Sequence, residues 1–300
     1  MQNGISSSRF KLRFATLFCA IILPHKSVRK GVTLCGLFQC GRSAHHIPCP
    51  VTLRTLPPPN RKERRNVIQI IRGDALQEIR KFPNGFFGGI ITDPPYSSGG
   101  AGSAVLQSTA VKYTATKGKC PYPDFEGDNK DQRSWTSWMA EWMGVAREKC
   151  KIGAPIVLFI DWRQLPSLTD ALQWAGWVWR GVAVWDKLNS RPQKGRFRQQ
   201  AEFIVWGSNG PMPVDRKAPV LPGVFGCAMP TAGQRVHQTQ KPLELMRQLV
   251  RICEPGSHIL DPFAGSGTTL EAARLEGYDA TGIELSEAYG AICIERLQSV

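Results

Sequence analysis

The chain runs Leu260-Asp261-Pro262-Phe263-Ala264-Gly265-Ser266-Gly267-Thr268-Thr269 where a short β-prone run, 259–260, gives way to a helical stretch, 268–275. The pattern predicts a turn from a strand into a helix. Its glycines allow a tight bend and a close approach of the backbone to a ligand, and the start of the next helix offers free N–H groups. We therefore expect a ligand site at this turn.

An acidic residue farther along indicates the kind of ligand. Glu284 follows the next predicted strand, 280–283, and in doubly wound folds this position reaches ribose hydroxyls. A phosphate-binding P-loop is disfavoured because no lysine follows Gly267. The spacing is not GxGxxG either, so a nucleoside cofactor fits better than a dinucleotide, which stays open. Taken alone, the motif also fits an ordinary glycine turn.

The chain around this turn alternates between short β-prone runs and amphipathic stretches. We expect strands at 67–71, 89–92, 156–160, 177–185, 202–206, 259–260 and 280–283. We expect helices at 75–81, 135–149, 165–175, 242–253, 268–275 and 287–297. A long loop, 97–133, and a Pro/Gly-rich connector, 209–233, interrupt the pattern. The alternation predicts an α/β domain over 66–300, with a doubly wound, mostly parallel sheet covered on both faces.

A second motif, Asp93-Pro94-Pro95-Tyr96, directly follows the predicted strand 89–92. Proline cannot continue a ladder, so the strand ends here, at the carboxyl edge where ligands bind. Asp93 and the Pro94 carbonyl can accept both hydrogens of an exocyclic amine, and Tyr96 can stack on a planar ring. A Pro-rich turn with a buried tyrosine is the alternative.

Together the motifs resemble those of the S-adenosylmethionine-dependent DNA amino-methyltransferases. The resemblance spans 67–297 and rests on Asp93–Tyr96, on Gln240-Lys241-Pro242 and on Asp261–Thr269. The catalytic motif precedes the cofactor motif, as in the circularly permuted group called beta. The resemblance implies a class I, Rossmann-like methyltransferase fold, S-adenosylmethionine as cofactor and double-stranded DNA as substrate. It also implies methylation of the N6 amine of adenine or the N4 amine of cytosine, on a base flipped out of the duplex.

The resemblance also assigns roles to residues. It implies a catalytic role for Asp93, Pro94, Pro95 and Tyr96, and no metal ion. It implies cofactor binding by Asp74, Ala75, Lys241, Pro242, Asp261, Pro262, Phe263, Ala264, Gly265, Ser266, Gly267, Thr268, Thr269 and Glu284. Two positions depart from the family pattern: Gln238 stands where proline is common, and Gly88-Gly89 replaces a polar-plus-aliphatic pair. We expect neither to abolish activity.

The motifs leave some alternatives open. Asp rather than Ser at position 93 favours adenine over cytosine. A ring-carbon cytosine methyltransferase is disfavoured because no suitably placed cysteine nucleophile occurs. An RNA or protein-glutamine methyltransferase remains a rival, because similar motifs act on planar amides. A non-enzymatic nucleic-acid-binding module would need no cofactor turn.

The net charge of +14 is unevenly spread along the chain. Residues 1–65 hold twelve lysines and arginines and one glutamate, which is +11, so 66–300 carries only +3. Within that region the basic side chains concentrate in one stretch, for which we expect DNA contact by Lys187, Arg191, Lys194, Arg196 and Arg198. We assign DNA contact and target recognition to residues 187–239. The loop 97–133, which we expect to be mobile, would share in reading the target sequence. A solvated surface hairpin is the alternative.

Residues 1–65 show no sustained periodicity, and we interpret them as a disordered, basic extension outside the fold. A secretory signal is disfavoured because no small-residue cleavage site follows the apolar run 14–23. That run is also too short to span a bilayer. A zinc site is disfavoured because the nine cysteines include no CxxC pair. Sparse cysteines indicate a cytoplasmic protein. The recognition sequence, the oligomeric state and a partner restriction enzyme stay open.

Overall fold

The computed structural model describes residues 66–97, 130–230 and 240–298. The chain divides into two units, 1–58 and 59–300, and every described residue belongs to the second. The predicted N-terminal extension, nearly all of the loop 97–133 and residues 231–239 lie outside the described residues.

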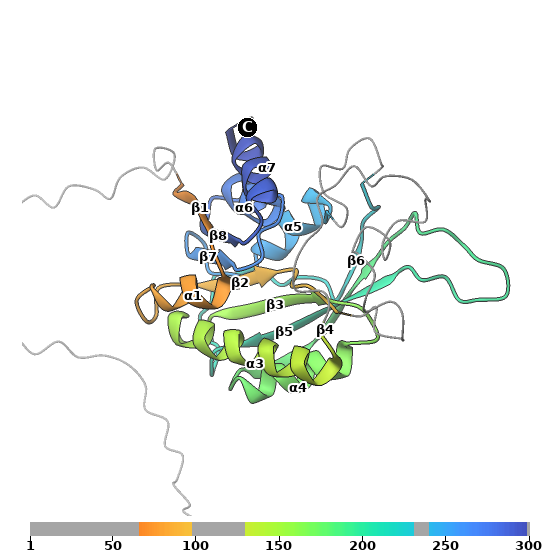
Figure 1. Ribbon diagram of the computed structural model, residues 1–300, viewed down its shortest axis with the longest axis horizontal. Coiled ribbons are helices and arrows are strands. Elements are labelled where there is room, and N and C mark those ends of the chain that lie inside the picture. The colour runs from red at the N-terminus through yellow and green to blue at the C-terminus, as the bar shows by residue number, and fades with distance from the viewer. Residues whose placement is uncertain (1–65, 98–129, 231–239, 299–300) are drawn as a thin grey trace, which may run out of the picture. The chain divides into compact units, whose positions relative to one another are not determined.

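The described residues form one eight-stranded sheet in the order β1-β8-β7-β2-β3-β5-β4-β6 (Figure 1). The first five strands in this order are parallel, β5 is antiparallel to β3 and to β4, and β6 is parallel to β4. The predicted mostly parallel α/β fold is confirmed. The strands are β1 (Ile68–Arg72), β2 (Gly89–Thr92), β3 (Pro155–Ile160), β4 (Val178–Asp186), β5 (Ala201–Ser208), β6 (Val224–Gly226), β7 (His258–Asp261) and β8 (Asp279–Glu284).

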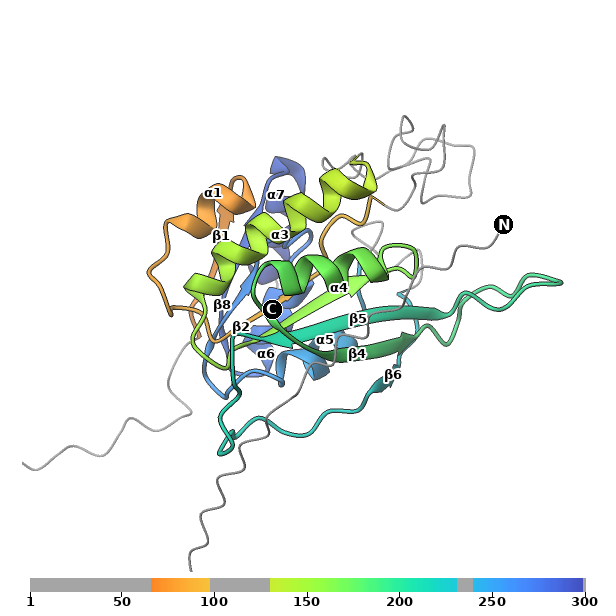
Figure 2. The ribbon, with the colours of Figure 1, turned by 90° about the horizontal axis from the view of Figure 1, so that it is seen from below.

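Helices cover both faces of the sheet, as Figures 1 and 2 show. Helices α1 (Ala75–Arg80), α3 (Gln132–Lys149) and α4 (Leu165–Trp174) pack on one face. Helices α5 (Leu243–Val250), α6 (Thr268–Leu275) and α7 (Glu287–Gln298) lie on the other. Each face therefore has its own apolar core, which is what a doubly wound sheet requires. No helix among the described residues is long and apolar enough to cross a bilayer.

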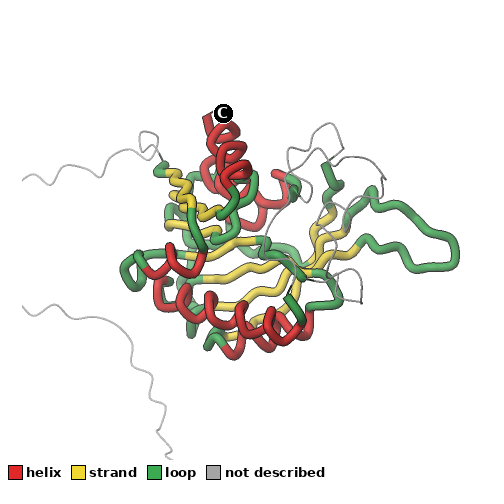
Figure 3. The backbone as a smooth tube through the Cα atoms, in the orientation of Figure 1, coloured by secondary structure: helices red, strands yellow, loops and turns green. Residues whose placement is uncertain are grey.

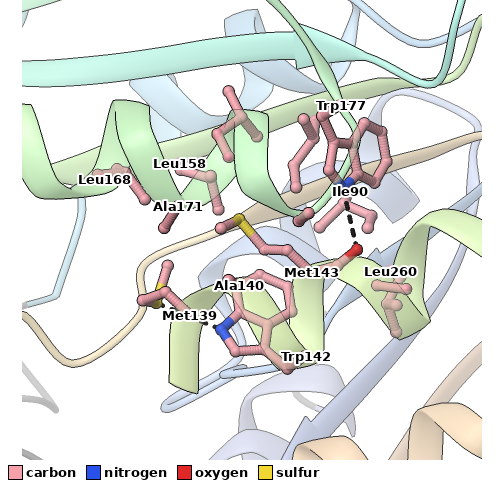
Figure 4. Packing of buried hydrophobic residues seen from close by; sticks show 14 of the residues in the cluster. Ile90, Met139, Ala140, Trp142, Met143, Leu158, Leu168, Ala171, Trp177 and Leu260 are labelled. Atoms are coloured by element: carbon pink, nitrogen blue, oxygen red, sulfur yellow. Dashed lines mark hydrogen bonds between the residues drawn. The ribbon is translucent and has the colours of Figure 1, made fainter. Parts of the chain in front are cut away.

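The core beneath α3 and α4 is built from large side chains with satisfied polar atoms (Figure 4). Trp142 and Trp177 are buried between the helices and the sheet. The Trp177 indole donates to the Met143 carbonyl at 2.9 Å, so burying its N–H leaves no donor unpaired. Burying a large apolar side chain contributes about 1.5–3 kcal/mol. This core therefore holds α3 firmly beside the sheet edge where the motifs lie.

The unusual Gly88-Gly89 pair has a packing explanation. A Cβ at Gly88 would lie 2.3 Å from Ser257 Cβ, and one at Gly89 would lie 2.3 Å from Cys253 Sγ. Real Cβ contacts are never so short, so β2 can reach its central place in the sheet only because both residues lack side chains.

Three elements differ by three residues or more from the sequence prediction (Figure 3). Helix α3 begins at Gln132, three residues before the predicted start at 135. Strand β6 lies within the connector predicted for 209–233. Its three residues pair with β4 and bury Phe225, a non-local pairing that leaves no local period in the sequence. Helix α5 ends at Val250, three residues before the predicted end, because residues 251–253 continue as a turn.

Candidate active site

The sheet brings the two motifs together because their strands are neighbours. Strands β2 and β7 run parallel in register, with Ile90 opposite Leu260. The motifs that follow them therefore emerge side by side at the same edge. The Thr92 hydroxyl donates to Asp261 Oδ1 at 2.6 Å and links the two strand ends directly. A cavity of about 1060 Å³ opens at this edge.

Most of the predicted site residues line this cavity. They are Asp93, Pro94, Pro95 and Tyr96, together with Asp74, Ala75, Lys241, Asp261, Pro262, Phe263, Ala264, Gly265, Ser266, Thr268, Thr269, Glu284 and Lys187. Two predicted cofactor residues do not line it. Pro242 is the N-cap of α5, and Gly267 is the N-cap of α6, packed against Cys293. Both residues therefore set the path of the backbone at the start of a helix and do not form the wall of the cavity.

The turn after β7 has the tight backbone that its glycines suggested. Gly265 and Gly267 have φ angles of +53° and +81°, which side-chain-bearing residues rarely adopt. A Cβ at Gly267 would lie 2.4 Å from Cys293 Sγ. Asp261 braces the turn by accepting from the Phe263 N–H at 3.1 Å. Burial raises the pKa of Asp261 to about 6, although its hydrogen bonds act in the opposite direction.

Glu284 lies at the end of β8 and closes one side of the turn. Its carboxylate accepts from the N–H groups of Gly265 and Ser286, both at 2.8 Å. Burial raises the pKa of Glu284. A carboxylate has about four lone-pair sites, so each oxygen of Glu284 can accept another hydrogen bond. Because it lines the cavity, that capacity is available to a ligand hydroxyl.

Aromatic side chains form a wall next to this turn. Phe263 contacts Trp138 and Trp142 of α3, with ring centroids 5.4 and 5.3 Å away. Trp138 and Phe263 both line the cavity. Asp74 lines it from the β1 side and caps α1 by accepting from the Gln77 N–H at 3.0 Å. This half of the cavity thus combines backbone donors, carboxylates and flat apolar surfaces.

The other half of the cavity contains a cluster of charged side chains around Asp93, Tyr96, Glu202 and Lys241. Lys241 pairs with Asp93 Oδ2, and its Nζ lies 3.2 Å from Glu202 Oε1. The Tyr96 hydroxyl lies 2.6 Å from Asp93 Oδ1 and 2.7 Å from Glu202 Oε1, and it donates to one of them at a time. Lys187 pairs with Glu202 Oε2 at 2.6 Å.

Burial and pairing shift the pKa values in this cluster. Burial raises the pKa of Asp93, and Lys241 only partly offsets this. Burial acts in the same direction on Glu202, but Lys241 and Lys187 outweigh it and lower its pKa to about 2. Burial lowers the pKa of Lys241, but the carboxylates of Asp93 and Glu202 outweigh it, so that pKa is raised. Burial, with the neighbouring carboxylates, also raises the pKa of Tyr96 well above 10.

The backbone of the Asp93–Tyr96 motif is held from α3. The Trp135 indole N–H donates to the Pro95 carbonyl at 2.7 Å, and Trp135 is fully buried. No described residue donates to the neighbouring Pro94 carbonyl. The motif is therefore fixed in place while one carbonyl oxygen beside Asp93 keeps its acceptor capacity for a ligand.

Several residues that line this cavity were not predicted from the sequence, among them Glu202, Trp138 and Trp185. Glu202 is a buried acid at the start of an apolar strand, which is an unusual pattern that could have marked it. Trp185 lies at the end of β4, donates to the Cys227 carbonyl at 2.7 Å and lines the cavity. The spacing of Trp138 in the sequence indicates only a helix face.

The predicted DNA-contacting residues are divided between two places. Lys187 lies in the cavity wall, paired with Glu202. The other four, Arg191, Lys194, Arg196 and Arg198, are exposed on the hairpin that joins β4 to β5. Figure 1 shows this hairpin projecting from the sheet at the right. Among the described residues, no group of three or more His, Cys, Asp or Glu side chains could hold a metal ion.

Comparisons with known proteins place this chain among DNA-modifying enzymes. A family model described as DNA methylase, N6_N4_Mtase, matches residues 88–221 and 215–295. The chain is 28% identical over 234 residues to the putative methylase YubD of Escherichia coli strain K12, covering 77% of this chain and 91% of that protein.

Two solved structures share the fold. The complex of M1.HpyAVI with S-adenosylmethionine matches with a TM-score of 0.56 and 24% identity, over 77% of this chain and 99% of that one. The cytosine-N4-specific PvuII DNA methyltransferase matches with a TM-score of 0.58 and 17% identity, over 78% of this chain and 89% of that one. The predicted class I methyltransferase fold is thereby confirmed.

Proposed function

Because the chain belongs to the DNA methylase family N6_N4_Mtase, we propose that it transfers a methyl group from S-adenosylmethionine to the N6 amine of adenine in double-stranded DNA. The observation that carries this proposal is that Asp93–Tyr96 and the turn Asp261–Thr269, apart from Gly267, line one cavity. Its volume of about 1060 Å³ is slightly above the usual range for a single-ligand site, as expected for a cofactor and a base together.

The residues around the turn after β7 fit S-adenosylmethionine. Glu284 has acceptor capacity for ribose hydroxyls, and Phe263 and Trp138 offer flat surfaces for the adenine ring. Asp74 and Ala75 lie at the same side of the cavity. S-adenosylmethionine supplies a methyl group that its sulfonium already activates. The task left to the protein is to position the accepting amine and to exclude water.

Asp93 and the Pro94 carbonyl would hold that amine. The lone pair of an exocyclic amine is delocalised into its ring, so the amine is a poor nucleophile. Accepting both of its hydrogens favours a tetrahedral nitrogen and localises the lone pair. Lys241 and Tyr96 each occupy one oxygen of Asp93, and a carboxylate retains further acceptor sites. Alignment of the reactants can lower the barrier by about 7–11 kcal/mol.

The target base must leave the helix to reach Asp93, at a cost of a few kcal/mol. Tyr96 and Trp185 both line the cavity and could stack on the extruded ring. The exposed basic hairpin at 191–198 would contact DNA phosphates, and residues 187–239 would share in target recognition. We place the reaction in the cytoplasm, where DNA and cofactor are both available.

Methylation of cytosine at N4 is the second candidate. It is favoured by the structural similarity to the cytosine-N4-specific PvuII enzyme. Adenine is preferred because Asp rather than Ser begins the motif at position 93.

Calorimetric titration of the full chain with S-adenosylmethionine tests the proposal. We expect saturable binding by the wild-type protein and by Asp93→Ala, with methyl transfer to DNA lost only in the variant. Asp170→Ala, at an exposed position on α4, should leave both properties unchanged. Absence of cofactor binding by the wild-type chain would overturn the proposal, and full transfer by Asp93→Ala would overturn the role of Asp93.

A further inference from the structure

Phe197 is fully exposed on the hairpin between β4 and β5. Its exposed fraction is 99%, and no other aromatic side chain among the described residues is as exposed. Burying a phenylalanine side chain away from water stabilises a fold by about 1.5–3 kcal/mol. The exposed ring of Phe197 makes no such contribution to the stability of this fold. An isolated exposed aromatic of this size is more easily understood as a contact with something outside the chain.

The charge around Phe197 indicates what that contact is. Residues 187–200 contain five lysines and arginines and no acid, and Phe197 lies between Arg196 and Arg198. A polyanion satisfies both features, because phosphates pair with the arginines while stacked bases offer apolar faces to the ring. A protein surface or a second copy of this chain would have to neutralise the same charge with acidic side chains.

The hairpin has a defined shape. The Lys187 N–H donates to the Gln200 carbonyl at 2.8 Å and closes its base. The Arg198 side chain donates through Nε to the Ser190 carbonyl at 2.9 Å and ties its two arms together. Arg198 is thereby fixed next to Phe197, so the aromatic side chain is presented from a braced backbone.

The hairpin also lies next to the candidate active site. A smaller hollow of about 230 Å³ is lined by Phe197 and by Lys187, Gln199 and Met229. The last three also line the large cavity. The hollow that Phe197 lines therefore shares three of its lining residues with the large cavity. Figure 2 shows the hairpin extending beyond the ends of β4 and β5.

We propose that Phe197 is a wedge that enters the base stack of duplex DNA beside the extruded target nucleotide. The inference rests on the proposed function, since it assumes that a base leaves the duplex at this cavity. The ring would fill part of the gap that the base leaves and replace lost stacking. Apolar side chains of other DNA-binding proteins are known to insert between base steps, where they partially unstack the bases and kink the duplex.

Binding to a duplex with a preformed gap tests the wedge without needing methylation. The full chain is titrated, by fluorescence anisotropy, into an intact duplex and into the same duplex with one abasic position. Aromatic stacking is worth about 1–3 kcal/mol per base, which corresponds to roughly 5- to 150-fold in affinity. We expect the wild-type protein to prefer the abasic duplex by at least about fivefold, and Phe197→Ala to lose that preference. Phe197→Trp should keep it.

Two controls show whether the preference for the abasic duplex comes from the Phe197 ring. Trp174→Ala removes another exposed aromatic, on α4, and should leave the preference unchanged. The salt dependence of binding should be the same for Phe197→Ala and wild type, because no charge is removed. A wild-type protein without the preference, or a Phe197→Ala variant that retains it, would overturn the wedge. Absence of methyl transfer in the same preparations would instead count against the proposed function.

Discussion

Replacing Glu202 by Gln removes the carboxylate that Lys187 and Lys241 share. The pKa of Glu202 is about 2, against an ordinary value of 4.5, and a difference of one pKa unit corresponds to about 1.36 kcal/mol. The carboxylate therefore contributes about 3 kcal/mol to the free energy of unfolding at neutral pH. Breaking one side of a buried ion pair typically costs about 3–5 kcal/mol, which agrees.

The pH dependence of this contribution has a definite sign. The folded-state pKa is lowered, so the stabilisation is present above about pH 4.5 and is lost as the pH falls towards 2. Urea unfolding of the full chain and of Glu202→Gln at pH 7 should differ by about 3 kcal/mol, and the difference should shrink below pH 4.5.

A matched control comes from the ion pair of Glu141 with Arg80, whose side chains are both more than half exposed and 3.6 Å apart. Glu141→Gln should cost less than about 1 kcal/mol, because exposed pairs contribute little. The reasoning is refuted if Glu202→Gln costs no more than Glu141→Gln, or if its cost is the same at pH 7 and at pH 3.5.

Two further predictions concern the cofactor turn and the hairpin. Gly267→Ala should lower the free energy of unfolding by about 2–4 kcal/mol, because the position has a left-handed φ and a Cβ there would clash with Cys293. Gly277 has a similar φ but open space around it, so Gly277→Ala should lower the free energy of unfolding by only about 1–2 kcal/mol. Equal losses for the two variants in urea titrations would contradict the packing argument. Replacing Arg191 and Lys194 together by Gln should flatten the slope of log affinity for DNA against log salt by about 1.8, and an unchanged slope would show that they make no phosphate contact.

The sequence was informative where the determining pattern was local. Most helices and strands begin and end within a few residues of their predicted positions, because apolar periodicity, prolines and glycines act over short stretches. The meeting of Asp93 with Asp261 at one cavity could also be expected, since Asp93 follows β2 and Asp261 ends the neighbouring parallel strand β7. Strand β6 could not, because three residues pair with β4 without a period of their own.

The place of Glu202 in the charged cluster was beyond sequence reasoning for a related reason. Glu202 is 109 residues from Asp93 and 39 from Lys241, so only the antiparallel arrangement of β3 and β5 brings it to the cavity. Lys187 was predicted to contact DNA, and its pairing with Glu202 gives it a second role. That prediction remains untested, as do the roles assigned to the other site residues.

The most direct test of the central claim is to identify the methylated nucleoside. DNA incubated with the full chain and isotopically labelled S-adenosylmethionine is digested to nucleosides and analysed by mass spectrometry, alongside DNA treated with Asp93→Ala. The account predicts labelled N6-methyladenine with the wild-type protein and none with the variant. Labelled N4-methylcytosine would contradict the assignment of adenine, and the absence of any labelled base would contradict the account as a whole.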